Sequence, residues 1–235
     1  MADFEGYVLL DIKGLVRHAY HIGTDPEGVI GEDEKQYNSA GWGLSKLLET
    51  YRLFEDIPPR KIIAVWDGGN DYRRLIWPEY KAKRAARAKD IDPINKEQID
   101  RLDANVMGML RALGATQVVV PGVEADDAIA MLCQQMKTNT IILHTVDADL
   151  LALAAQHDRV KVMLKNELIE DQYKGSQMKA PVPLELIRLY KSVVGDSSDE
   201  YPGVVGMGDK AWNDMHTAYG TDGMLQLESI IQRRD

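Results

Sequence analysis

Nine acidic side chains occur in five short segments, each placed where an apolar run or loop gives way to another element. In an α/β fold the carboxyl ends of the strands meet along one crevice, so acids at those ends would gather there. Anions gathered so closely would repel one another unless hard divalent cations neutralised them. The pattern therefore predicts a metal site with the ligands Asp11, Asp67, Glu124, Asp126, Asp127, Asp147, Asp149, Asp196 and Asp199.

Each acidic segment also has a purely structural interpretation. The trio 124–127 opens a predicted helix, where negative charge complements the helix dipole, and the other aspartates suit caps and turns. Five such segments together favour the metal site. Ligands that are all oxygen favour Mg²⁺ or Mn²⁺ over zinc, and the histidines show no metal-ligand spacing, with His144 expected in the core. A site this acidic can hold two ions about 4 Å apart, the arrangement used for phosphoryl transfer.

The elements that would position these acids alternate along the chain. Short runs rich in β-branched residues predict strands at 7–10, 62–66, 117–120, 140–145 and 160–164. Apolar residues at helical spacing predict a helix over 96–113 that ends at Gly114, and further helices over 39–54, 124–136, 183–194 and about 225–231. This alternation predicts an α/β fold with a mainly parallel sheet flanked by helices.

Two segments depart from this alternation. Between Arg73 and Lys89 seven cations accompany one acid, Glu79, and the alanine-rich run 80–87 favours a helix. Lys81, Arg84 and Arg87 share a helical stripe that could attract a nucleic-acid backbone, although a solvated helix face is the common explanation for such a run. The aromatic side chains between the cations could stack on bases or, for Trp77, pack in the core: Tyr72, Trp77 and Tyr80.

The second segment, 201–210, is rich in glycine and precedes a helix predicted to begin near Asp209. Gly203, Gly206 and Gly208 permit a turn that exposes backbone N–H groups, and Lys210 follows them. A turn of this kind at a helix N-terminus can bind a phosphate group, although most glycine loops are only turns.

Composition is that of a globular protein, and its overall acidity is only weak evidence against a nucleic-acid partner. The net charge is −9, but setting the nine clustered acids aside leaves the remaining 226 residues of the 235-residue chain with no net charge. The single cysteine, Cys133, lies in an apolar run and is expected to be buried, with no disulfide. No apolar run approaches membrane-spanning length and no signal pattern begins the chain, so we expect a cytoplasmic protein.

Taken together, these motifs resemble the flap endonuclease/5′-nuclease superfamily, which includes bacteriophage 5′–3′ exonucleases and the 5′-nuclease domain of bacterial DNA polymerase I. The matching motifs occur in family order over almost the whole chain. They are Leu9-Leu10-Asp11, Val65-Trp66-Asp67, Pro78-Glu79-Tyr80-Lys81-Ala82-Lys83-Arg84, Gly122-Val123-Glu124-Ala125-Asp126-Asp127, Val146-Asp147-Ala148-Asp149-Leu150, Val194-Gly195-Asp196-Ser197-Ser198-Asp199 and Pro202-Gly203-Val204-Val205-Gly206-Met207-Gly208-Asp209-Lys210-Ala211.

The resemblance implies a PIN-like α/β core in a single domain, 1–235. The core would cover 1–70 and 102–182, a basic helical arch about 71–101, and a helix–two-turn–helix element, similar to a helix-hairpin-helix, about 183–235. Asp11, Asp67, Glu124, Asp126 and Asp127 would serve a first Mg²⁺, and Asp147, Asp149, Asp196 and Asp199 a second, with Mn²⁺ as a substitute. The glycine loop would grip duplex backbone and bind K⁺.

The resemblance also assigns the remaining roles. Lys81 and Arg84 would be catalytic cations that steer the phosphate. The DNA-binding residues would be Arg73, Arg74, Tyr80, Lys83, Arg87, Gly203, Gly206, Gly208 and Lys210. The sequence departs from the family pattern after the first aspartate, where Ile12 and Lys13 replace a glycine and a small polar residue, and at His18, where arginine is usual. Lys13, His18 and Tyr20 are the candidate contacts for a DNA 5′ end.

These features predict a structure-specific 5′ nuclease, active as a 5′–3′ exonuclease or flap endonuclease in replication or repair. It would use two metal ions to cut DNA at a 5′ end, flap or junction, with RNA primers as a further substrate. We expect a monomer that does not associate with a membrane. A DNA-junction binding protein with weak catalysis is the alternative that Ile12 and Lys13 raise. An RNA-directed PIN-type nuclease would share the acidic core but would not explain the glycine loop or the basic arch.

Overall fold

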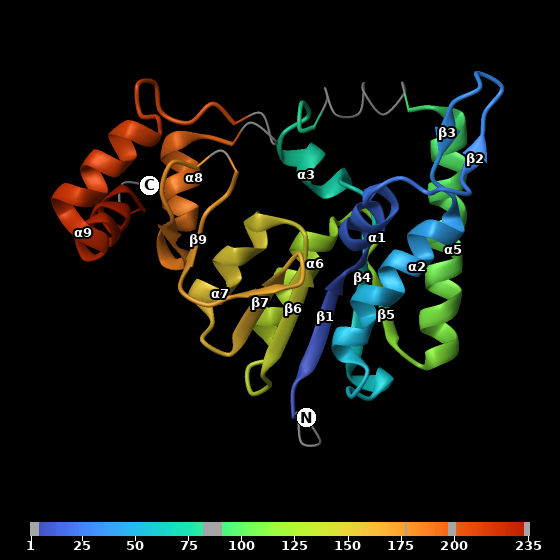
Figure 1. The fold of residues 1–235 in the computed structure, drawn as a ribbon. Coiled ribbons are helices and arrows are strands. Elements are labelled where there is room, and N and C mark those ends of the chain that lie inside the picture. Colours follow the sequence, from blue (N-terminus) through green and yellow to red (C-terminus); the bar gives the residue numbers. More distant parts are fainter. Residues whose placement is uncertain (1–4, 82–90, 177, 197–200, 233–235) are drawn as a thin grey trace. The chain divides into compact units, whose positions relative to one another are not determined.

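The computed structural model describes residues 5–81, 91–176, 178–196 and 201–232 (Figure 1). The chain divides into two compact units, the first made of Met1–Ala148 and Arg159–Leu168 and the second of Asp149–Asp158 and Ile169–Asp235. The sequence-based boundaries of core, arch and C-terminal element cut the chain at other points. They differ because the short segment 149–158, which precedes the last parallel strand, packs with elements that come later in the chain.

The first unit is built on a six-stranded sheet with the order β5-β4-β1-β6-β7-β8. The four pairs from β5 to β7 are parallel, as the strand–helix alternation predicted, and the predicted strands match the observed ones to within one residue at either end. The strands are β1 (Tyr7–Asp11), β4 (Ile62–Trp66), β5 (Thr116–Val119), β6 (Ile141–Thr145), β7 (Val160–Leu164) and β8 (Glu167–Ile169).

Three helices bury their apolar faces against the side chains that the strands direct to one face of the sheet. The cluster that includes Leu15 of α1 (Ile12–His21), Leu47 of α2 (Ala40–Tyr51) and Leu102 of α5 (Pro93–Leu113) also holds Val8 and Ile62 of the strands. Both long helices begin after a capping side chain: Ser39 accepts a bond from the N–H of Trp42, and Asp92, which the sequence analysis did not identify, accepts one from the N–H of Ile94, so that α5 begins three residues before its predicted start at 96. Gly114 ends α5 in the left-handed conformation, as predicted.

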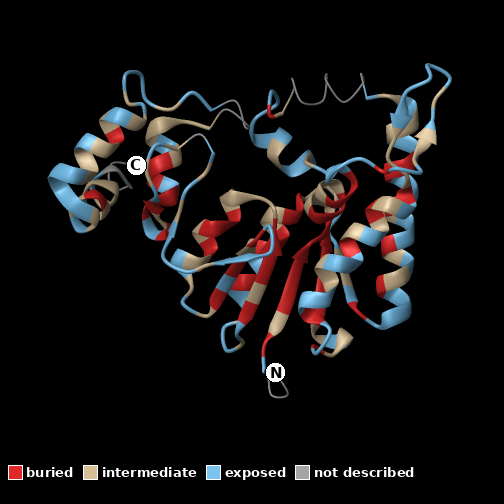
Figure 2. Ribbon diagram, viewed as in Figure 1, coloured by how far each residue is buried: buried red, intermediate tan, exposed pale blue. Residues whose placement is uncertain are grey.

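The sheet is also buried on its second face. Leu9, Ile63 and Val65 alternate with the residues of the first cluster and are buried outside it. The central strands are coloured mainly as buried in Figure 2. Helix α6 (Ala125–Gln135) contacts β1 and β4, so it covers this second face. Cys133 of α6 is fully buried, and burial raises the pKa of its thiol to about 11, which confirms the prediction of a structural cysteine.

Shorter elements connect the main ones in the first unit. A hairpin of β2 (Val29–Ile30) and β3 (Gln36–Tyr37) precedes α2, and the 3₁₀ turns η1 (Arg52–Phe54) and η2 (Pro59–Lys61) follow it. Helix α3 (Asp71–Ile76) follows β4. The 3₁₀ turn η4 (Ala148–Leu151) follows β6. Most of the helix predicted over 80–87 lies outside the described residues.

The second unit contains α7 (Ala152–Gln156), a hairpin of β9 (Gln172–Tyr173) and β10 (Val182–Pro183), the turn η5 (Leu184–Leu186), α8 (Ile187–Val194) and α9 (Asp209–Gln232). The helix predicted from residue 183 instead begins at Ile187, because Pro183 pairs in β10 and a 3₁₀ turn follows it. The helix expected near 225–231 is part of α9, which starts at Asp209 as predicted and kinks at Gly220. No helix among the described residues is both long and apolar enough to cross a bilayer.

Candidate active site

Three of the predicted carboxylates lie at the ends of neighbouring parallel strands. Asp11 is the last residue of β1, Asp67 follows β4, and Asp147 comes two residues after β6. β1 pairs with β4 on one side and with β6 on the other. The sheet therefore brings these three segments to one edge, as the strand-end pattern predicted.

Thr145, which the sequence analysis missed, links two of these segments. Its hydroxyl donates to Asp11 Oδ2 at 2.7 Å, and the backbone N–H of Asp147 donates to the same hydroxyl at 2.9 Å. Burial raises the pKa of Asp11, which is 5% exposed; the Thr145 hydroxyl and the Gly14 N–H lower it, while repulsion from Asp147 and Asp67 raises it. A Cβ on Gly14 would lie 2.7 Å from Asp11 Oδ2, so this position excludes side chains. A threonine ending a buried strand beside an acid is the signal that could have revealed Thr145.

The α6 acids approach the same group. Glu124 is the N-cap of α6 and Asp126 lies in its first turn. The pKa of Asp126 is raised to about 7, first by burial and then by repulsion from Asp11, Asp147 and Glu124, with Lys81 opposing the rise. This mutual repulsion is the electrostatic signature of a group of acids whose negative charge is only partly compensated by the protein. A cation placed there would be strongly favoured.

Cationic side chains already contact the outer members of the group. Lys81 Nζ lies 2.9 Å from Glu124 Oε1. Arg73 makes a bidentate ion pair with Asp127, in which Nη2 lies 2.8 Å from Oδ1 and Nε lies 3.0 Å from Oδ2. The Tyr80 hydroxyl donates to Glu124 Oε2 at 2.8 Å and receives a bond from Arg73 at 2.6 Å. Tyr80 is therefore buried as a structural link rather than exposed for stacking.

Lys13 contacts the acid at the end of β4. Its ammonium group lies 3.2 Å from Asp67 Oδ2, while Asp67 Oδ1 accepts the backbone N–H of Gly69. Among the residues that the structure describes, no three acidic, histidine or cysteine side chains are grouped closely enough to hold a metal ion as they stand. The ion pairs with Lys13, Lys81 and Arg73 give a physical reason, because they draw Asp67, Glu124 and Asp127 toward side-chain cations.

The remaining predicted ligands, Asp149, Asp196 and Asp199, belong to the second unit. Lys191 of α8 forms ion pairs with both Asp149 and Asp196, the latter at 2.8 Å. The backbone of Asp196 also pairs with that of Tyr201 in an isolated bridge. Asp199 lies outside the described residues.

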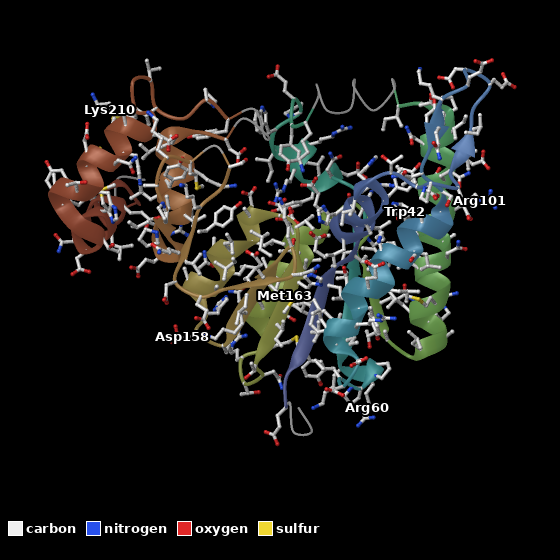
Figure 3. All side chains as sticks on the ribbon, in the orientation of Figure 1. Trp42, Arg60, Arg101, Asp158, Met163 and Lys210 are labelled. Atoms are coloured by element: carbon white, nitrogen blue, oxygen red, sulfur yellow. The ribbon has the colours of Figure 1, made fainter. Side chains whose placement is uncertain are left out.

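The glycine loop in this unit has the backbone conformation that only glycine adopts easily. Gly203 has φ +67°, and a Cβ there would lie 2.5 Å from the Gly195 nitrogen; Gly206 has φ +83°. Asp209, the first residue of α9, accepts a 2.6 Å hydrogen bond from Tyr190, whose ring contacts the buried Trp212 edge-on. Lys210 follows and is exposed (Figure 3).

The residues predicted to contact DNA differ in how far they are exposed. Tyr20 is 1% exposed, and its hydroxyl lies 2.6 Å from the Asn38 carbonyl oxygen, so it has no surface to offer a 5′ end and belongs to the core instead. His18 is half-buried, and burial followed by repulsion from Lys165 lowers its pKa. Arg74 is exposed on α3. Lys83, Arg84 and Arg87 lie outside the described residues.

Residues 6–181 match the protein family described as the 5′-3′ exonuclease, N-terminal resolvase-like domain. The chain belongs to this 5′–3′ exonuclease family. Its relatives include a 5′-3′ exonuclease of Bacillus subtilis, 30% identical over 87% of this chain and 67% of that protein. Another is DNA polymerase I of Treponema pallidum, 31% identical over 96% of this chain and 22% of that protein. The chain thus spans about a fifth of the polymerase's length and two thirds of the exonuclease's.

Two solved structures share the fold of this chain. The bacteriophage T5 5′-exonuclease with bound zinc ions aligns over 91% of this chain and 75% of its own, with a TM-score of 0.59 and 19% identity. A bacteriophage T5 flap endonuclease, in a pseudo-enzyme-product complex with DNA and metal ions, aligns over 94% of this chain and 78% of its own, with a TM-score of 0.63 and 18% identity. These likenesses confirm the α/β fold predicted from the strand–helix alternation.

Proposed function

We propose that this chain is a metal-dependent 5′ nuclease that hydrolyses DNA phosphodiester bonds as a 5′–3′ exonuclease or flap endonuclease. The observation that carries the proposal is the pair of strand-end acids Asp11 and Asp147, joined through Thr145, with Asp126 of α6 close enough to be repelled by both, in a chain of the 5′–3′ exonuclease family. The relatives are named as exonucleases and polymerases, and one structural neighbour is a flap endonuclease in complex with DNA and metal ions. These names support DNA as the substrate class.

The donor set fits divalent metal ions. All the candidate ligands are carboxylates, which suit hard cations, and burial together with mutual repulsion raises the pKa of both Asp11 and Asp126. Asp11, Asp67, Glu124, Asp126 and Asp127 would hold the first ion. Asp147, Asp149, Asp196 and Asp199 are the predicted ligands of the second. Bound Mg²⁺, or Mn²⁺ in its place, would supply an activated water and charge stabilisation for the leaving oxygen.

The protein's own cations have a separate part in this proposal. Lys81 and Arg73 form ion pairs with Glu124 and Asp127 in this structure. Where those carboxylates held a metal ion instead, the ammonium and guanidinium groups would be available to contact the scissile phosphate, with their positive charge where the transition state becomes more negative. Arg84 is predicted to assist Lys81. K⁺ at the glycine loop, RNA primers as substrates, a monomeric state and a cytoplasmic location complete the proposal.

A labelled duplex with a 5′ flap, incubated with Mg²⁺ or with EDTA, tests the proposal. Asp147→Asn should reduce cleavage by at least about 10³-fold, since it removes charge from the metal ligands, and should leave DNA affinity within about threefold. Asp100→Asn is the matched control, because Asp100 is an exposed acid on α5 that pairs with Lys96 one turn earlier on the same helix. Cleavage by Asp147→Asn at the wild-type rate, or wild-type cleavage in EDTA, would contradict the metal assignment.

The alternative is a DNA-junction binding protein with weak catalysis. The Lys13–Asp67 ion pair favours it, because an ammonium group lies against a predicted metal ligand. The same flap substrate separates the two functions. A binding protein would retain tight binding of the flapped duplex and would leave it uncut at any Mg²⁺ concentration, whereas a nuclease would release a labelled 5′ product.

A further inference from the structure

The second unit contains a cavity of about 450 Å³ whose lining includes none of the predicted nuclease residues. Its walls come from α7, the segment between β8 and β9, η5 and α9. All of its lining residues belong to the second unit, so the cavity is complete within that unit. Pockets that bind small organic molecules have volumes of roughly 300 to 1,000 Å³, and this cavity falls in that range. We call it the α7 cavity.

The walls of the α7 cavity are tied to one another. The N–H of Leu184 donates to the carbonyl oxygen of Asp171 at 3.0 Å, and β9 and β10 pair in an antiparallel hairpin. Both α7 and α9 contact η5. Helix α9 kinks at Gly220, where φ is +64°, and the next residue, Thr221, lines the cavity. The cavity is therefore formed by packing between several elements of the fold and not by a single loop.

The lining of the α7 cavity is strongly acidic. Of its ten residues, four are carboxylic acids and none is lysine, arginine or histidine. The four acids are all exposed: Asp158 (Figure 3), Glu170, Asp171 and Glu185. Within the described part of the chain, no lysine or arginine forms an ion pair with any of them. Four of the other six lining residues are apolar: Ala154, Ala155, Pro183 and Leu184.

This combination of charge and apolar surface narrows the chemistry of a ligand. The four carboxylates would repel phosphate groups, and therefore nucleic acid. A neutral ligand would desolvate the carboxylates and offer them no compensating charge. A bare divalent cation does not fit either, since no three acidic side chains among the described residues are grouped closely enough to hold one. An organic cation that carries its charges at separate points along an apolar chain matches both features.

We propose that the α7 cavity binds a linear polyamine, a methylene chain that carries two or more ammonium groups. Its ammonium groups would pair with carboxylates such as Glu170 and Glu185, and its methylene groups would contact Ala155 and Leu184. Alkylammonium groups have pKa values of about 10, so such a ligand is fully charged at pH 7. A lysine-rich segment of a partner protein offers similar charge. Stable protein interfaces, however, bury roughly 1,200 to 2,000 Å² in total, so a single cavity of this size suits a small molecule better.

Calorimetric titration of spermidine, a triamine, into the full chain tests this site. The titration uses an ionic strength of about 0.15 M and contains neither DNA nor divalent metal, so its outcome is independent of the nuclease function. The wild-type chain should bind spermidine at one saturable site. Glu170→Gln/Glu185→Gln should weaken binding roughly 5- to 30-fold, the loss expected for two exposed ion pairs. Ala155→Phe keeps all four acids but fills part of the cavity, and should weaken binding by a similar factor.

Glu32→Gln/Glu34→Gln is the matched control for charge. It removes the same two charges from exposed acids in the β2–β3 loop of the first unit and should keep the wild-type affinity. All the substituted side chains are exposed, and unchanged thermal unfolding of each variant without ligand confirms that the fold is retained. Equal losses in the two paired variants would overturn the proposal, because spermidine would then respond only to the net charge of the chain. Wild-type affinity in Ala155→Phe would also overturn it, because the ligand would then lie outside the cavity.

Three competing ligands complete the test. Butylamine carries one ammonium group and should bind at least about tenfold more weakly than spermidine; equal affinity would overturn the proposal of a multiply charged ligand. Mg²⁺ at the same concentration should leave spermidine bound, and displacement would identify a metal site instead. A tetralysine peptide should bind no more tightly than spermidine. If it binds at least about tenfold more tightly and the same variants abolish that binding, the occupant is a basic protein segment and the polyamine proposal fails.

Discussion

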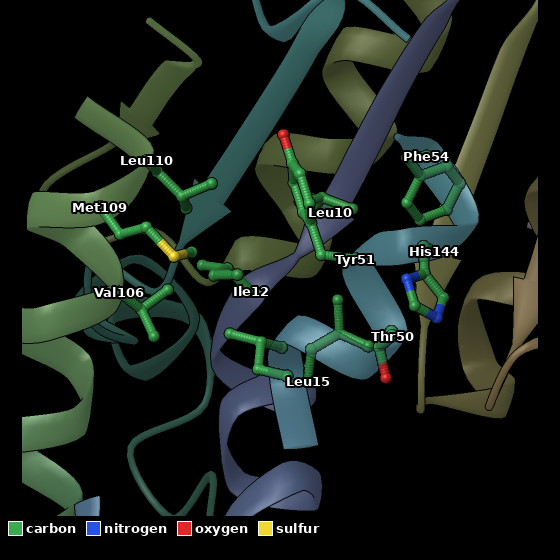
Figure 4. Close-up of a pocket in the computed structure, with 11 residues that line it drawn as sticks. Leu10, Ile12, Leu15, Thr50, Tyr51, Phe54, Val106, Met109, Leu110 and His144 are labelled. Atoms are coloured by element: carbon green, nitrogen blue, oxygen red, sulfur yellow. The ribbon is translucent and has the colours of Figure 1, made fainter. Parts of the chain in front are cut away.

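Acidification from pH 7 to pH 5 should destabilise the first unit through His144. The side chain of this residue is fully buried on β6, beside Phe54 and a cavity of about 20 Å³ (Figure 4). Its Nε2 lies 3.0 Å from Asn166 Oδ1, so Nε2 carries the proton, and no polar atom of the described residues bonds to Nδ1. Protonation would place an N–H at Nδ1 with no acceptor, in surroundings that are largely apolar.

The magnitude follows from the difference in pKa between the folded and unfolded states. Burial, with a smaller contribution from His18, lowers the pKa of His144 to about 4 from an ordinary value of 6.5. Between these values the unfolded chain binds more protons than the folded chain, so stability is complete above pH 6.5 and falls as the pH decreases. From pH 7 to pH 5 the expected loss in the free energy of unfolding is about 2 kcal/mol, levelling off below pH 4.

Urea unfolding followed by tryptophan fluorescence at several pH values measures this loss. Asp126 acts with the opposite sign, because an acid with a raised pKa stabilises the folded state at low pH and loses that contribution as the pH rises. His144→Gln, which keeps an N–H donor for Asn166 but does not titrate, therefore provides the reference. The free energy of unfolding of the wild type minus that of the variant should fall by about 2 kcal/mol between pH 7 and pH 5. Parallel curves would refute the assignment of this titration to His144.

Two further predictions concern Lys13 and the glycine loop. Lys13→Met removes the ammonium group from Asp67 and should tighten Mn²⁺ binding, measured by calorimetry without DNA, by roughly 2- to 10-fold. The control Lys96→Met breaks an exposed ion pair on α5 and should leave the Mn²⁺ affinity unchanged. An unaltered Mn²⁺ affinity in Lys13→Met would show that the Lys13–Asp67 pair does not compete with metal. Gly203→Ala should destabilise the second unit by at least about 2 kcal/mol, because φ is +67° and the Cβ would meet backbone, whereas Gly208→Ala meets nothing within 4 Å. Equal unfolding midpoints for the two glycine variants, followed through Trp212 fluorescence, would contradict that reasoning.

The sequence by itself determined the parts of this protein that depend on local pattern. Alternating apolar strands and helices predicted the parallel sheet, Gly114 predicted the end of α5, and Asp11, Asp67 and Asp147 could be assigned to strand ends that meet at one edge. These inferences succeed because side-chain period and strand-end position are properties of neighbouring residues.

Only the tertiary structure decided which side chains touch. Thr145 reaches Asp11 across 134 positions in the sequence, and Arg73 reaches Asp127 across 54, contacts that no local pattern specifies. Tyr20 and Tyr80 fitted a DNA-binding pattern, yet packing buried both, while Trp77, for which a core position was considered, is exposed. Burial and long-range ion pairing depend on how distant segments pack, and that packing is set by the whole core rather than by the residues on either side.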